Sequence, residues 1–146
     1  FGDTTPYGVE ALTDANVCVF RRADFDRFAR DHPRLEHKLL ERTLSELDRT
    51  RRWMLLLSRM NAEQKMATFL LEMSERLAPH GCLNAVNAAS VFALPLSRQQ
   101  IGDVLGLTIE TVSRQFTKLK SEGLIGLPSR REVTILERSA LENRAV

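Results

Sequence analysis

The chain is poor in cysteine and has no long apolar run. Its two cysteines, Cys18 and Cys82, lie far apart and form no CxxC pair and no metal-binding cluster with the three scattered histidines. This usage predicts a reducing, cytoplasmic location, no structural disulfide and no metal site. Because no run of about 18 apolar residues occurs, we also expect no membrane-spanning helix and no membrane partner. The Cys82 thiol is either oxidisable or an ordinary loop thiol.

Catalytic patterns are missing as well. The sequence contains no nucleophile–base pair, no metal-ligand spacing and no Gly-rich phosphate loop, so we predict that the protein is not an enzyme. The net charge of +2 is small, but charge is unevenly distributed. Six basic and three acidic residues lie between Val91 and Arg131, and a local basic excess is typical of a phosphate-binding surface.

The N-terminal segment predicts the end of a larger β structure. Residues 1–8 are rich in turn formers, and the β-rich run from Val9 to Arg22 predicts one or two short strands. Two strands do not form a stable sheet alone, which indicates missing neighbours. Asp24 is expected to cap a short helix that ends near Arg30.

A long uninterrupted helix is predicted from about Arg34 to about Arg59, with Pro33 in its first turn. Spacings of four and three residues along it are typical of a coiled-coil seam. Two interpretations stay open: the seam joins two copies of the chain, or the helix is buried within one subunit. The seam residues, which we expect to make a homodimer, are Leu40, Leu44, Leu47, Arg51 and Met54.

Capping residues predict the helices that follow. Asn61 with Gln64, and Ser97 with Gln100, have the spacing of capping boxes. Val91 to Leu94 is expected to be a short strand between these two helices, and Ile101, Val104 and Leu105 to face the interior. Gly106 is placed to end the second helix and Thr108 to cap a third, which is the layout of a helix-turn-helix.

The third helix carries two separate stripes. One is apolar and expected to pack inward, and the other is polar, as a DNA-reading helix requires. Arg pairs with guanine and Glu accepts from the cytosine amino group, while the Glu110 carboxylate can also hold Arg114 one turn away. A surface ion pair on an ordinary amphipathic helix is the alternative interpretation. The apolar stripe consists of Ile109, Val112, Phe116 and Leu119, and the polar stripe of Glu110, Ser113, Arg114 and Thr117.

A β-hairpin is predicted after this helix, which Gly123 ends. Leu124-Ile125 and Val133 to Leu136 are strand-like, and Arg130 and Arg131 lie in the turn between them. The hairpin indicates a wing whose arginines contact phosphate, although a solvated turn would have the same pattern.

The run LPLSRQQIGDVLGLTIETVSRQFTKLKSEGLI resembles the DNA-binding domain of the CRP/FNR family of bacterial transcription regulators. Within it, Glu110-Thr111-Val112-Ser113-Arg114 is similar to the E-x-x-S-R recognition motif of the FNR/FixK branch. The stretch MLLLSRMNAEQKMATFLLEMSERL is similar to the junction before that domain, and the resemblance covers about Val9 to Leu136.

The resemblance implies a mostly α fold with a small amount of β structure. It divides the chain into the remnant of a β-barrel, cyclic-nucleotide-binding-like sensor domain (1–31), a long dimerisation helix (32–60) and a winged helix-turn-helix DNA-binding domain (61–146). It also implies a homodimer that reads palindromic TTGAT-type double-stranded DNA through Glu110, Ser113 and Arg114. Residues expected at the DNA backbone or flanking it are Ser97, Arg98, Thr108, Thr111, Thr117, Lys118, Arg130 and Arg131.

The resemblance further implies transcription activation through RNA polymerase, contacted by roughly Ala78 to Ala89, in a response to oxygen limitation or nitrogen oxides. No cofactor is visible, since the sequence holds neither a nucleotide-binding signature nor the cysteine cluster of an iron–sulfur centre. FixK-type relatives need no small effector and FNR-type relatives sense oxygen, and both types stay open. The alternative function is a dimeric winged-helix adaptor that binds protein, which would expose an apolar face instead of a polar stripe.

Overall fold

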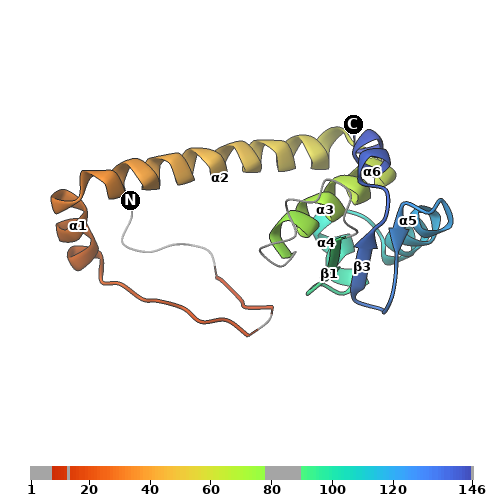
Figure 1. Cartoon of the computed structure of the whole chain (residues 1–146), viewed down its shortest axis with the longest axis horizontal. Helices are drawn as coiled ribbons and strands as arrows, with labels where there is room; N and C mark the ends of the chain where they lie inside the picture. Colours follow the sequence, from red (N-terminus) through yellow and green to blue (C-terminus); the bar gives the residue numbers. More distant parts are fainter. Residues whose placement is uncertain (1–7, 13, 78–89, 146) are drawn as a thin grey trace. The chain divides into compact units, whose positions relative to one another are not determined.

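In a computed structural model of the chain, residues 8–12, 14–77 and 90–145 are described. They divide into two compact units, Phe1–Arg49 and Thr50–Val146. The boundary between the units falls within the helix α2 (Pro33–Arg59), which Figure 1 shows as one continuous helix. The domain boundaries predicted near residues 31 and 60 separate regions by their expected function, whereas these units are separated by their packing. The domain boundaries stay a prediction.

The first unit contains α1 (Arg22–Asp31) and most of α2 (Pro33–Arg59). The strands predicted between Val9 and Arg22 are wrong for this chain, because residues 8–12 and 14–21 contain no strand. A strand needs a neighbour to pair with its backbone groups, and the described residues provide none there. Val17 and Val19 are consequently exposed, as is the thiol of Cys18.

The predicted cap of α1 is also wrong. The helix begins at Arg22 after Arg21, which makes no side-chain capping bond, and Asp24 lies inside the first turn. There its carboxylate accepts from Arg27 at 2.7 Å. The prediction for α2 is confirmed, since the helix begins at Pro33, where a missing backbone N–H costs nothing.

The second unit combines four further helices with a three-stranded antiparallel sheet. Its helices are α3 (Ala62–Leu77), α4 (Arg98–Leu105), α5 (Ile109–Ser121) and α6 (Arg138–Arg144). Its strands are β1 (Ser90–Ala93), β2 (Ile125–Gly126) and β3 (Glu132–Ile135), in the order β1-β3-β2. Phe92 lies opposite Val133, and Gly126 lies opposite Thr134. The mostly α fold with a small β component is confirmed.

One apolar core holds this unit together. It takes Leu56 from the end of α2, Met66, Phe69 and Leu70 from α3, and Phe116 from α5. Trp53 of α2 and Met60, which directly follows that helix, pack against it. The short helix α6, which the sequence analysis did not predict, adds the fully buried Leu141.

None of the helices in the described ranges combines the length and apolarity needed to cross a membrane. Within the same ranges, no group of three or more His, Cys, Asp or Glu side chains is placed to hold a metal ion. Cys82 and the segment expected to contact RNA polymerase, Ala78 to Ala89, lie outside the described residues.

Candidate nucleic-acid interface

The helix-turn-helix is fixed by the caps predicted from the sequence. The Ser97 hydroxyl accepts from the backbone N–H of Gln100 at 3.2 Å, and the Gln100 side chain accepts from the Ser97 N–H at 2.8 Å. Gly106 ends α4 with a φ of 63°, a left-handed conformation that favours glycine. The Thr108 hydroxyl then accepts from the backbone N–H of Thr111 at 3.3 Å and starts α5.

The turn between α4 and α5 is tight because Gly102 has no side chain. Its carbonyl accepts from the Leu107 N–H at 2.9 Å. A Cβ placed on Gly102 would lie 2.6 Å from the Leu107 carbonyl oxygen, which is too close for any non-bonded contact. Lys65 of α3 donates to the carbonyl of Leu105 at 3.1 Å, so a positive charge lies at the C-terminal end of α4, where the helix dipole favours it.

The two stripes of α5 separate largely as predicted. Val112, Phe116 and Leu119 are buried. Ile109 is 38% exposed, because it begins the helix one turn beyond the core, so its inward placement was predicted wrongly. Val104 of α4 is 42% exposed, because it lies beside the face that Ile101 and Leu105 present to the core. The residues of the polar stripe, all exposed, are Glu110, Ser113, Arg114 and Thr117.

Glu110 lies in the first turn of α5, where its surroundings favour the ionised form of the carboxylate. Hydrogen bonds to its own backbone N–H and to the Thr108 hydroxyl lower the pKa of Glu110, and the charge of Arg114 lowers it further. The negative carboxylate is therefore an acceptor, as contact with a cytosine amino group requires. The Thr117 hydroxyl donates to the Ser113 carbonyl at 3.0 Å, which keeps it against the helix backbone.

Two of the basic residues expected at the DNA backbone are engaged within the protein. The guanidinium carbon of Arg98 lies 3.1 Å from the centroid of the Phe116 ring, and the Arg98 Nη1 is buried with no hydrogen-bond partner among the described residues. Burial lowers the pKa of Arg98 to about 10. The Lys118 ammonium contacts the Glu63 carboxylate of α3 at 2.5 Å.

The wing is present as a hairpin of β2 and β3, and Gly123 precedes it with a φ of 72°. At its turn the Ser129 hydroxyl accepts from the backbone N–H groups of Arg131 and Glu132, at 3.4 and 3.1 Å. Arg130 and Arg131 are both exposed. Two exposed arginines therefore lie on the hairpin that follows α5 in the sequence.

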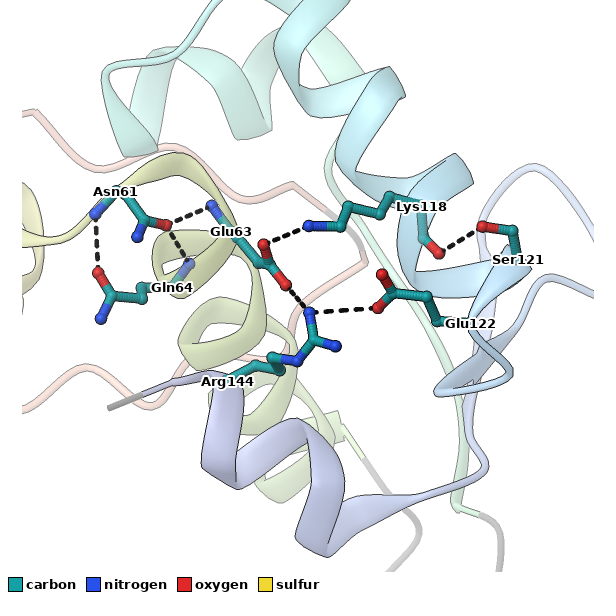
Figure 2. Close-up of polar contacts among 7 residues, drawn as sticks. All are labelled: Asn61, Glu63, Gln64, Lys118, Ser121, Glu122 and Arg144. Atoms are coloured by element: carbon teal, nitrogen blue, oxygen red, sulfur yellow. Dashed lines mark hydrogen bonds and ion pairs between the residues drawn. The ribbon is translucent and has the colours of Figure 1, made fainter.

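A second polar cluster was missed by the sequence analysis. Glu63 contacts both Lys118 and Arg144, and Arg144 contacts Glu122 at 3.3 Å (Figure 2). The two pairs that involve Glu63 join residues more than 50 positions apart in the sequence. No local spacing could have indicated them.

Comparison with known proteins gives the context of this site. Residues 64–144 match the family model described as a Crp-like helix-turn-helix domain. The chain is 42% identical over 142 residues to the transcriptional activator protein FnrL of Cereibacter sphaeroides, covering 97% of this chain and 57% of that protein. It is 43% identical over 121 residues to the nitrogen fixation regulation protein FixK of Bradyrhizobium diazoefficiens, covering 83% and 49%. The chain thus spans about half the length of the curated relatives that it matches.

Solved structures agree. FixK2 from Bradyrhizobium japonicum is similar with a TM-score of 0.73 and 38% identity, over 86% of this chain and 59% of that one. A mutant of CooA from Carboxydothermus hydrogenoformans shares the fold, with a TM-score of 0.69 at 18% identity, over 85% and 55%. The matched relatives are named as regulators, and this supports the prediction that the chain is not an enzyme.

Proposed function

Because this chain belongs to the FNR/FixK branch of the CRP/FNR family of transcription regulators, we propose that it reads double-stranded DNA through the exposed face of α5. The observation that carries the proposal is the polar stripe of α5. Glu110, Ser113 and Arg114 are exposed on one face, while Val112 and Phe116 anchor the opposite face in the core. A protein-binding adaptor would need an apolar face at this place.

The bases recognised are those of a TTGAT-type half-site. Arg114 pairs with guanine O6 and N7, and the ionised Glu110 accepts from a cytosine amino group. Exposed hydroxyls at the starts of α4 and α5 and the arginines of the wing hold the phosphates, which sets the register without reading sequence. The residues that we place at or beside the DNA backbone are Ser97, Arg98, Thr108, Thr111, Thr117, Arg130 and Arg131. Lys118 was predicted there as well, but it pairs with Glu63 and is treated below.

The protein acts as a homodimer on a palindromic site. The exposed fractions of the apolar seam residues on α2 support this: 57% for Leu40, 52% for Leu44, 44% for Leu47 and 65% for Met54. Four apolar side chains at coiled-coil spacing, together with Arg51, fit a second copy of the same helix. We place the dimer in the bacterial cytoplasm, where it activates transcription through RNA polymerase, in keeping with the words "transcriptional activator" in the name of FnrL.

The base-reading proposal is tested by fluorescence anisotropy with the whole chain at one fixed salt concentration, since phosphate contacts make affinity salt-dependent. A labelled TTGAT-N4-ATCAA duplex is compared with one whose G·C pairs are exchanged. We expect a clear preference for the first duplex. Arg114→Ala should remove about 1–3 kcal/mol of it for each lost bidentate contact.

Lys120→Ala is the matched control, because it removes the same charge from an exposed position of the same helix, six residues beyond Arg114 toward the C-terminal end. It should leave the preference unchanged. Equal weakening of both duplexes by both variants would contradict base reading by α5.

The dimer is tested separately by sedimentation. Leu44→Glu places a charge in the seam and should give a monomer, because a buried unpaired charge is costly. Arg52→Gln changes the charge by the same amount at an exposed position off the seam and should remain a dimer. A wild-type monomer at micromolar concentration would overturn the dimer proposal.

A further inference from the structure

A polar cluster at the C-terminal end of α5 joins three helices. Glu63 comes from the first turn of α3, Lys118 and Glu122 from the end of α5, and Arg144 from the last turn of α6. Figure 2 shows the Glu63 side chain between those of Lys118 and Arg144. Lys118 approaches one carboxylate oxygen of Glu63, and Arg144 approaches the other. One carboxylate therefore holds two helices.

The cluster is neutral and partly shielded. Its two carboxylates and two cations balance, and the Glu63 side chain is only 21% exposed. Hydrogen bonding to Lys118 lowers the pKa of Glu63, with Arg144 acting in the same direction. The carboxylate is thus ionised when its partners are in place, and Lys118 carries no uncompensated charge toward solvent.

Glu63 is itself held in place. The Asn61 side chain caps α3 by accepting from the N–H groups of Glu63 and Gln64, each at 3.0 Å. The Gln64 side chain accepts from the Asn61 N–H at 3.0 Å and completes the capping box (Figure 2). The first turn of α3 is therefore fixed by its cap. Lys118, which lies one helical turn after the base-reading Arg114, donates to Glu63 in this turn.

We infer that Glu63 is a positioning residue for base recognition, which acts through Lys118 and is supported by Arg144. It fixes the C-terminal end of α5 to α3, so that Arg114 and Glu110 meet the bases at one angle. Bidentate base contacts depend on such preorganisation by residues behind the contacting ones. Lys118 then serves the protein's own carboxylate instead of a DNA phosphate. This inference rests on the proposed function.

The competing role for Lys118 makes opposite predictions. If the ammonium binds phosphate in the complex, Glu63 merely competes with DNA, and its removal strengthens binding to any sequence. Each lost phosphate contact would also reduce the slope of log affinity against log salt by about 0.9.

The experiment uses the whole chain carrying both Glu63→Gln and Lys118→Met. This double variant has the net charge of the wild type, so a change in binding does not arise from total charge. Binding to the TTGAT-N4-ATCAA duplex and to its exchanged counterpart is measured by anisotropy at several salt concentrations.

Glu75→Gln is the control for losing a carboxylate from α3. Because it raises the net charge by one, it is judged by the preference between the two duplexes and not by overall affinity. Glu75 also lies on α3 and pairs with α6, through Arg138 at 2.8 Å, but the pair leaves α5 untouched. Lys118→Arg is the conservative variant, because it keeps a cation in reach of Glu63. Circular dichroism and thermal unfolding confirm that each variant is folded.

We expect the double variant to lose about twofold to fivefold in preference for the TTGAT duplex, the range that partly exposed ion pairs support. Affinity for the exchanged duplex and the salt slope should stay at wild-type values. Glu75→Gln and Lys118→Arg should keep the full preference.

Two results overturn the inference. A lower salt slope with weaker binding to both duplexes identifies Lys118 as a phosphate ligand. An unchanged preference shows that the cluster has no part in reading. Arg114→Ala is measured in parallel. If this variant keeps the wild-type preference, the proposal that α5 reads bases is wrong, and the inferred role of Glu63 is wrong with it.

Discussion

Phe20 and Phe69 have the same side chain, but Phe20 is 74% exposed and Phe69 is 1% exposed. They represent the two units. In the described part of Phe1–Arg49, Ala29 is the only buried residue, whereas the core of Thr50–Val146 includes residues of every helix from α2 to α6. The difference shows where stability comes from. The second unit buries a core of apolar side chains, whereas large apolar side chains of the first unit, such as Phe20, are exposed.

Polar contacts differ in the same way. In the first unit, pairs such as Asp24–Arg27 and Lys38–Glu41 join residues three positions apart on one helix. In the second unit, Glu63–Lys118 joins two helices. Local pairs stabilise a helix wherever it lies, but they do not fix one element against another. The second unit therefore has a defined tertiary structure of its own.

The largest expected effect comes from replacing each of the two phenylalanines by alanine, which tests whether the two units differ in stability. Phe69→Ala should lower the free energy of unfolding by about 3–5 kcal/mol, because it opens a cavity in a closed core. Phe20→Ala should change it by no more than about 0.5 kcal/mol, as is usual for exposed positions. Denaturant titration of both variants measures the difference. A comparable cost for Phe20→Ala would mean that the first unit has a core of its own.

Two glycines give the next effect. Gly102→Ala should cost about 1–3 kcal/mol, because its methyl group would collide with the Leu107 carbonyl in a turn that cannot widen freely. Gly8→Ala should be nearly neutral, because nothing lies within 4 Å of the added methyl group. Thermal unfolding compares them. If Gly102→Ala is also neutral, the turn between α4 and α5 is looser than its geometry indicates.

The smallest expected effect is the change with acid pH in the difference in thermal stability between Glu63→Gln and the wild type. The pKa of Glu63 is lowered in the folded state, so the stability it contributes is complete above the ordinary pKa of 4.5 and is lost as the pH falls through the lower folded value. Glu63→Gln should therefore unfold a few degrees below the wild type at neutral pH, and the gap should close in acid. Melting curves between pH 7 and pH 3 measure this gap. A gap that is constant with pH would assign it to packing instead of charge.

Local signals predicted much of the DNA-binding part. Ser97 with Gln100, Gly106 and Thr108 define helix ends through bonds that span at most four residues, so their spacing in the sequence is sufficient. The inward stripe of α5 was predictable for the same reason, because helical geometry places Val112, Phe116 and Leu119 on one face.

Features that depend on distant residues were not predictable in this way. The run around Val17 has β propensity, but a strand forms only with a partner. Ile109 continues an apolar stripe, but the core ends before reaching it. Glu63 and Arg144 are ordinary charged residues in the sequence, and only the packing of α3 against α6 brings them together. The helix α6 is short and lacks a side-chain cap, so Leu141 alone gave no recognisable period.

The central strand of the small sheet has a consequence for how the protein is made. The strand β3 pairs with β1, which precedes the helix-turn-helix, and with β2, which follows it. During synthesis α4 and α5 emerge before residues 132–135, so the helix-turn-helix exists for a time without the strand that pairs with the strands on either side of it. Chains grow at roughly 5–20 residues per second, so the segment stays unpaired for roughly 0.5–2 s. A nascent chain that stalls before residue 132 would contain α5 but would lack the strand that joins β1 to β2.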